Sequence, residues 1–269
     1  RSQDENLLRD AAENSQFFDV RSFAWERLGE NNKSIAEIVI NTKKSAPVDD
    51  IYNKIVDDET LEWIAIDAMD KRYRNASVEK SSSPEILYDL VFKSSDKSIR
   101  KACVLKDSFD DEEILKKVAI EDKDEQVKRA AIGKIENEEI LAEIAKSEEN
   151  AKVRSLIFDK IDNPEILKSI VLNSSKSDVR SDLVNKIDDE DLLVQIALED
   201  SDKVVRSEAV KKISDEKSLL KIISTDDDRF VRQIAVNNLS NPQELIKIAL
   251  EDEDQFVRDH AISNPAIEI

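Results

Sequence analysis

The chain has 269 residues and a formal net charge of −19, because 60 acidic side chains outnumber 41 basic ones. This charge disfavours nucleic acid as a natural partner. With two glycines, one histidine and one cysteine, the sequence cannot form a glycine-rich phosphate-binding loop, a Cys/His zinc site, a disulfide or an iron–sulfur ligand set, so we expect no cofactor and no metal.

From the N-terminus onward, the sequence repeats a pattern about every 26 residues, in which an apolar anchor is followed in most copies by a basic residue. The steps between anchors are 27, 26, 26 and 28 residues up to Val127 and 26 residues after it. Small or apolar residues four, five and usually eight positions after the anchor predict an amphipathic first helix. The ten anchors are Val20, Pro47, Tyr73, Ile99, Val127, Val153, Val179, Val205, Val231 and Val257.

A second track predicts a second amphipathic helix in each repeat, because a leucine is followed three and four residues later by apolar pairs. An Asp three residues before six of the anchors is the expected N-cap of the first helix, and a capping residue followed by proline opens three of the second helices. The leucines are Leu61, Leu87, Leu115, Leu141, Leu167, Leu193, Leu219 and Leu245. The caps are Asp70, Asp96, Asp124, Asp202, Asp228 and Asp254, with Ser83, Asn163 and Asn241 before the prolines.

A pair of helices this short cannot bury both of its faces alone, so neighbouring pairs must stack. The sequence therefore predicts an all-α fold, an α-solenoid of about ten 26-residue two-helix repeats in a single continuous array over residues 1–269. We expect the array to be more regular from residue 112 onward, with bends near Gly29 and around Asp107 to Asp111. A half-repeat stands at each end; the halves are either caps or the cut ends of a longer array, and we favour the second alternative.

The repeat reads V-R-x-x-A-[IV]-x-x-[IL]-x-x-x-x-x-L-x-x-I-A-x-x-D-x-D and resembles HEAT-like repeats over nearly the whole chain. Residues 257–265 look like the leucine-rich repeat variant type, which is similar to the armadillo-type fold. The resemblance implies a right-handed, curved array whose second helices line the inner surface. The iron–sulfur cluster that variant-type proteins can carry is not implied here, because Cys103 is the single cysteine.

An arginine follows the anchor in eight repeats. This column is either a ladder that binds a polyanion or a structural ladder in which each guanidinium pairs with an Asp of a neighbouring repeat. We favour the structural ladder. The recurring Asp-x-Asp loops are either calcium ligands or helix caps, and we favour caps because the EF-hand glycine and terminal Glu are absent. The ladder residues of the regular part are Arg154, Arg180, Arg206, Arg232 and Arg258.

Two residues before the second-helix leucine, an acid stands in six consecutive repeats. This position points about 160° away from the buried leucine, toward the inner surface in the geometry that the resemblance implies. Trp63 lies on the same face and is either an interface anchor or a side chain folded back over the early repeats. The predicted binding surface consists of Trp63 with Glu59, Glu85, Glu113, Glu139, Glu165 and Asp191.

The leading hypothesis is a non-enzymatic scaffold whose acidic inner surface binds a basic or extended segment of another protein. We expect a cytoplasmic monomer with no nucleic-acid partner and no membrane insertion, since no apolar run approaches a membrane span. No catalytic residue is predicted, because Cys103 falls in a core position and His260 has no nucleophile pattern beside it. The alternatives are an enzyme or lyase subunit of HEAT-like type and a passive spacer in a larger protein.

Overall fold

The computed structural model describes residues 3–42 and 48–267. Within these residues the chain forms twenty α-helices and no strand, so the predicted all-α class is confirmed. Contacts between Cα atoms group the chain into two compact units, residues 1–136 (unit 1) and 137–269 (unit 2). The predicted anchor Pro47 lies outside the described residues.

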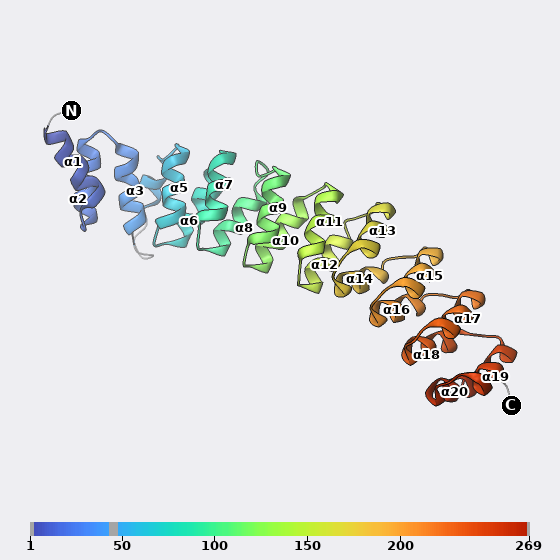
Figure 1. Ribbon diagram of the computed structural model, residues 1–269. Coiled ribbons are helices and arrows are strands. Elements are labelled where there is room, and N and C mark those ends of the chain that lie inside the picture. The colour runs from blue at the N-terminus through green and yellow to red at the C-terminus, as the bar shows by residue number, and fades with distance from the viewer. Residues whose placement is uncertain (1–2, 43–47, 268–269) are drawn as a thin grey trace. The chain divides into compact units, whose positions relative to one another are not determined.

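In unit 1 the predicted first helices are the even-numbered ones and the predicted second helices are the odd-numbered ones (Figure 1). Helix α5 packs on α6, α7 on α8 and α9 on α10, and α6, α8 and α10 contact one another in succession. The helices are α1 (Gln3–Asn14), α2 (Phe18–Arg27), α3 (Asn31–Asn41), α4 (Asp49–Tyr52), α5 (Asp58–Asp67), α6 (Lys71–Lys80), α7 (Pro84–Lys93), α8 (Lys97–Leu105), α9 (Glu112–Glu121) and α10 (Glu125–Lys134).

Unit 2 has the same alternation. Each odd-numbered helix packs on the even-numbered helix that follows it, and α12, α14, α16, α18 and α20 contact one another in succession. The helices are α11 (Glu138–Ser147), α12 (Ala151–Phe158), α13 (Pro164–Asn173), α14 (Ser177–Val184), α15 (Glu190–Glu199), α16 (Lys203–Val210), α17 (Glu216–Thr225), α18 (Arg229–Asn238), α19 (Pro242–Glu251) and α20 (Gln255–Ile262).

Polar side chains begin these helices where the sequence predicts them. All six predicted Asp caps accept a hydrogen bond from a backbone N–H of the first turn, as Asp202 does from Val204 at 2.8 Å. The three predicted cap–proline pairs begin α7, α13 and α19. Helix α14 departs from the pattern, because Lys176 stands at its N-cap and lysine has no acceptor to offer.

Acid is expected to destabilise the protein through these caps. The hydrogen bond from the Val204 N–H lowers the pKa of Asp202 from its ordinary value of 3.8. A carboxylate whose folded pKa is lowered contributes stability above its unfolded pKa, and this contribution is lost as the pH falls through the folded pKa. The free energy of unfolding should therefore decline below about pH 4.

Urea denaturation followed by circular dichroism at a series of pH values checks this expectation. Asp202→Asn keeps a cap but cannot titrate, so the decline in acid should be shallower in this variant. Asp188→Asn serves as the control, since that side chain is 98% exposed. An equally shallow decline in the control would contradict the role assigned to Asp202.

The core is made by most of the predicted anchors and leucines and by most of the apolar residues five positions after the anchors. The anchors from Tyr73 to Val257 are buried, but Val20 is 40% exposed, so its prediction as a core anchor is wrong. Ile262 is 57% exposed, although its equivalent Val236 is buried. Among the eight leucines, Leu167 is partly buried and the others are buried.

The two longer steps contain different local structures. Gly29 follows the end of α2 with φ +77°, a left-handed conformation that favours glycine. The second step contains Phe109, whose side chain is fully buried and meets the ring of Tyr88 edge-on at a centroid distance of 4.9 Å. Lys134 donates hydrogen bonds to the carbonyl oxygens of Lys106 and Phe109. This insertion is therefore packed into unit 1, and the bends predicted at the two steps stay predictions.

Candidate functional site

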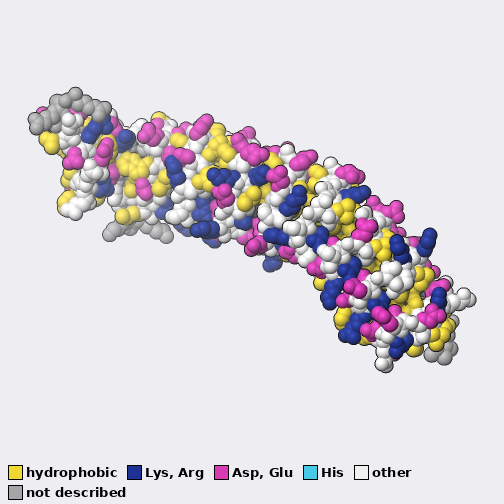
Figure 2. All heavy atoms as spheres, viewed as in Figure 1, with side chains coloured by type: hydrophobic (Ala, Val, Ile, Leu, Met, Phe, Trp, Pro, Cys, Tyr) yellow, Lys and Arg dark blue, Asp and Glu magenta, His cyan; other side chains and the backbone are white. Residues whose placement is uncertain are grey.

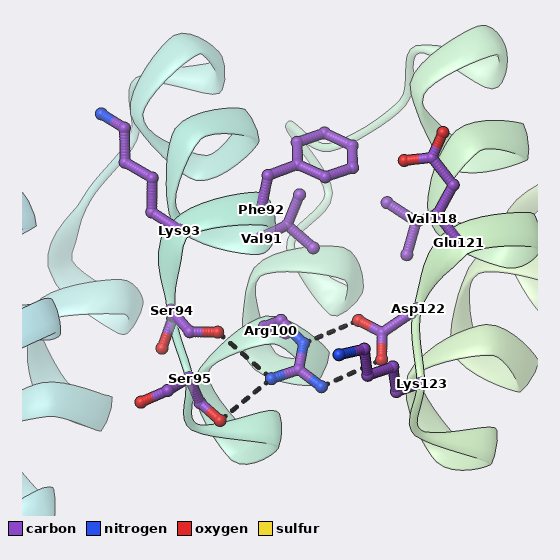
Figure 3. A pocket seen from close by; sticks show the side chains of 10 residues that line it. All are labelled: Val91, Phe92, Lys93, Ser94, Ser95, Arg100, Val118, Glu121, Asp122 and Lys123. Atoms are coloured by element: carbon purple, nitrogen blue, oxygen red, sulfur yellow. Dashed lines mark hydrogen bonds and ion pairs between the residues drawn. The ribbon is translucent and has the colours of Figure 1, made fainter.

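Each ladder arginine is engaged by the fold. Arg180 donates two hydrogen bonds of 2.7 Å to the carboxylate of Asp200 in the next helix pair, and a third of 2.9 Å to the carbonyl of Ser174 in the loop before its own helix. Figure 3 shows the equivalent two-bond pairing of Arg100 with Asp122 in unit 1. The same pairing joins Arg206 to Asp226 and Arg232 to Asp252.

Arg154 and Arg258 do not form the two-bond pairing with a single Asp of the next helix pair. Ser174 stands where the next repeat otherwise supplies an Asp, and Arg154 pairs instead with Asp178 and Asp182, at 3.1 and 2.6 Å. Arg258 donates to the backbone carbonyl oxygen of Asp252 at 2.8 Å, and has no carboxylate partner within the described residues. The guanidinium groups thus link neighbouring helix pairs, which leaves few of them for an anionic ligand.

The Asp-x-Asp loops are also used by the fold. Asp200 accepts from Arg180 and from the N–H of Asp202 at 2.8 Å, while Asp202 caps α16. Within the described residues, no group of three or more His, Cys, Asp or Glu side chains is placed to hold a metal ion. Both carboxylates of the loop therefore have a structural partner.

A second ladder, which was not predicted, stands seven residues after each anchor from Tyr73 onward. Lys212 donates to the carbonyl oxygens of Asn185 and Ile187, and Asn264 donates to that of Val236 at 2.9 Å. These contacts satisfy carbonyl groups at the end of the preceding first helix. The signal was in the sequence, because the position holds Lys80, Lys106, Lys134, Lys160, Lys186, Lys212, Asn238 and Asn264.

Acids three residues before the second-helix leucine form another unpredicted set of contacts. Glu190 accepts hydrogen bonds from the N–H groups of Ser214 and Asp215 in the next helix pair, at 2.7 and 2.9 Å. The bond from Ser214 is the main cause that lowers the pKa of Glu190. The equivalent acids Glu112, Glu138 and Glu216 accept from N–H groups of the following loop in the same way. Asp58 accepts from the Ser81 hydroxyl and from the Ser82 N–H.

The six predicted surface acids stand one residue further along each helix, and all six are exposed. Within the described residues, none of their carboxylates bonds to a neighbouring helix pair. In unit 1, three of them lie in the first turn of helices α5, α7 and α9, which contact one another in succession. We call Glu59, Glu85 and Glu113 the acidic row. In unit 2, the first turns of α11, α13 and α15 contain Glu139, Glu165 and Asp191.

Trp63 lies beside the first acid of the row. Its side chain is partly buried and packs against the core of unit 1, which is the fold-back arrangement. It also lines a cavity of about 310 Å³, so part of the indole stays accessible. The other lining residues are Glu13, Trp25, Lys33, Glu59 and Thr60.

An apolar row, also unpredicted, accompanies the acidic row in unit 1. It consists of Ile66, Phe92 and Ile120, which are 37%, 45% and 42% exposed. Each lies seven residues after an acid of the acidic row, which is about 10 Å along the same helix and on nearly the same face. Phe92 lines a hollow of about 560 Å³ formed by α7, α8 and α9 (Figure 3). Figure 2 shows apolar side chains gathered between acidic and basic ones on the visible face.

Cys103 and His260 are the single cysteine and the single histidine of the sequence, and the structure shows the surroundings of both. Cys103 is fully buried, and burial raises the pKa of its thiol to about 12, which disfavours the reactive thiolate. Nδ1 of His260 lies 2.8 Å from the Phe256 carbonyl oxygen, within its own helix. In the part of the chain that the structure describes, no helix combines the length and the apolar character that a membrane crossing needs.

Comparisons with known proteins add little. No protein-family model matches the sequence, and no curated protein matches it. A solved structure described as "Computational Design of Self-Assembling Cyclic Protein Homooligomers" is similar over 96% of this chain and 86% of its own, at 11% sequence identity and a TM-score of 0.11. A TM-score this low does not show a shared fold.

Proposed function

We propose that the protein is a non-enzymatic scaffold of the HEAT-like α-solenoid type that binds a basic, extended segment of another protein on its second helices. About ten two-helix repeats would form a right-handed array, in which the second helices face the partner. The succession of contacts within each unit supports this architecture. We expect the protein to be a monomer and to act in the cytoplasm.

One observation carries the binding proposal: the acidic row is exposed, and within the described residues its carboxylates make no bond to a neighbouring helix pair. The acids one residue earlier bind the next helix pair, and the Asp-x-Asp acids bind arginines or cap helices. The acids of the acidic row make local contacts at most: Glu85 accepts from the Ser83 hydroxyl at 2.8 Å, and Glu113 lies 3.9 Å from Lys116 of its own helix. Carboxylates stacked on successive helices attract a chain of positive charge and raise its association rate.

The apolar row extends the proposal to the composition of the partner. Ile66, Phe92 and Ile120 run parallel to the acids, so the best ligand carries apolar side chains beside its basic ones. Phe92 already has an ammonium group over its ring, since Nζ of Lys117 lies 4.7 Å from the ring centroid. This face therefore accommodates both kinds of side chain.

Charge reversal tests the acidic row. Changing Glu59, Glu85 and Glu113 to lysine should weaken binding of an oligolysine peptide about tenfold, as measured by calorimetry, because three attractive charges become repulsive. The dependence of affinity on salt should also flatten, since fewer opposed charges remain to be screened.

The matched control carries the same change of charge elsewhere in unit 1. Glu79, Asp107 and Glu136 are exposed acids outside the row, and their reversal to lysine should reduce affinity far less. The corresponding reversal of Glu139, Glu165 and Asp191 shows whether unit 2 binds as well. Unchanged affinity after the charge reversal in unit 1 and also after that in unit 2 would refute the proposal.

A further inference from the structure

We propose that the cavity beside Trp63 is the anchor point for the partner, where it binds one lysine side chain; this inference rests on the proposed function. The cavity lies within unit 1 and measures about 310 Å³. Four helices build it: α1 supplies Glu13, α2 supplies Trp25, α3 supplies Lys33, and α5 supplies Glu59, Thr60 and Trp63.

The lining suits an ammonium group on an aliphatic stem. Two indoles line the cavity, Trp25 at 5% exposure and the partly buried Trp63. Tryptophan is the most favourable ring for contact with a cation. Glu13 and Glu59 add two carboxylates at the same cavity, and both residues are exposed. Within the described residues neither carboxylate has an ion-pair partner, so both are available to an incoming cation.

An ammonium group of the chain itself already uses one of these indoles. Nζ of Lys33 lies 4.9 Å from the centroid of the Trp25 ring and 3.0 Å from a carboxylate oxygen of Glu30. The Trp25 wall therefore accepts a lysine ammonium in this setting. Because Lys33 carries the same charge as the ligand, it should weaken the binding of that ligand.

The surroundings favour a lysine within a longer segment over a free small cation. A second hollow of about 280 Å³ shares Lys33, Glu59 and Thr60 with the cavity, and Glu30 and Asp57 lie in its wall. A chain that leaves the cavity at this side meets Glu30, which already pairs with Arg9 and Lys33, and Asp57, which already caps α5. Glu59 also belongs to the acidic row, so the cavity joins the row at its first member.

The two tryptophans make this cavity directly observable. Trp25 and Trp63 are the only tryptophans in the sequence, and both line the cavity. Titration with an oligolysine peptide should therefore change the tryptophan emission in a saturable way. The same peptide acetylated on every Nε has lost its charge and should leave the emission unchanged.

Three variants, measured by calorimetry as well as by emission, define the site. Glu59→Gln should weaken oligolysine binding about three- to fivefold, and Trp63→Leu up to about tenfold, because a charge or a cation-binding ring is removed. Lys33→Met keeps the aliphatic stem and should strengthen binding about threefold, an effect that a merely damaged fold would not produce.

The outcomes separate this inference from the proposed function. Calorimetric binding without any emission change, or an equal emission change with the acetylated peptide, overturns the lysine cavity and leaves the acidic row standing. Weaker binding after Lys33→Met also overturns it. Absence of oligolysine binding by both measurements overturns the cavity and the proposed function together.

Discussion

Replacing Phe109 by alanine is expected to lower the free energy of unfolding of unit 1 by about 3–5 kcal/mol. The side chain is fully buried, and its ring packs edge-on against Tyr88. Truncation leaves a cavity at the longest step between repeats and removes the aromatic contact. It also loosens the loop to which Lys134 donates its hydrogen bonds. Few other single substitutions in this chain remove as large a buried ring.

Tryptophan emission measured along a urea titration reads this effect selectively, since Trp25 and Trp63 both belong to unit 1. Phe92→Ala is the matched control, because it deletes the same side chain at a position that is 45% exposed. Phe92→Ala should lower the free energy of unfolding of unit 1 by less than about 1 kcal/mol. Equal losses in the two variants would show that Phe109 does not support unit 1.

Replacing Asp226 by asparagine is expected to lower the free energy of unfolding of unit 2 by about 3 kcal/mol. The Asp226 side chain is 4% exposed and that of Arg206 is 11% exposed, and the pair shares two hydrogen bonds of 2.7 and 3.0 Å. Asparagine keeps the shape but presents an NH₂ group to one guanidinium donor. The mostly buried positive charge of Arg206 then lacks its compensating carboxylate.

Asp227 provides a strict control for this prediction. It also contacts Arg206, with its Oδ1 at 2.9 Å from Nη2, but its side chain is 93% exposed. Asp227→Asn should therefore change stability by less than about 1 kcal/mol. Circular dichroism along a urea titration measures both variants, and similar losses for Asp226 and Asp227 would contradict the structural ladder.

The ladders also bear on function. Three sets of side chains make contacts between neighbouring helix pairs: the ladder arginines, the lysines seven residues after the anchors, and the acids three residues before the second-helix leucines. Within the described residues, Glu59, Glu85 and Glu113 make no bond to a neighbouring helix pair, although Glu85 accepts from Ser83 and Glu113 pairs with Lys116 inside their own repeats. They also stand on successive contacting helices, which is why the proposed function rests on them.

The sequence alone determined the helical class, the positions of most helices, their caps and most of the core. These features are local, because a helix and its cap are defined by residues two to four positions apart. The six Asp caps and the anchors from Tyr73 to Val257 lie where the pattern placed them. The exposure of the six surface acids likewise follows from helical periodicity.

Only the tertiary structure decided which charged group meets which partner. The sequence favoured an arginine ladder that pairs with an Asp of a neighbouring repeat, but it did not specify that Arg180 meets Asp200, 20 residues away, or that Lys212 meets the carbonyl oxygen of Asn185, 27 residues away. The exposure of Val20 depends on what covers α2, and the cavity beside Trp63 depends on four helices meeting. Such features arise from packing between helix pairs, where a shift of one residue changes which groups come into contact; the local pattern does not contain that information.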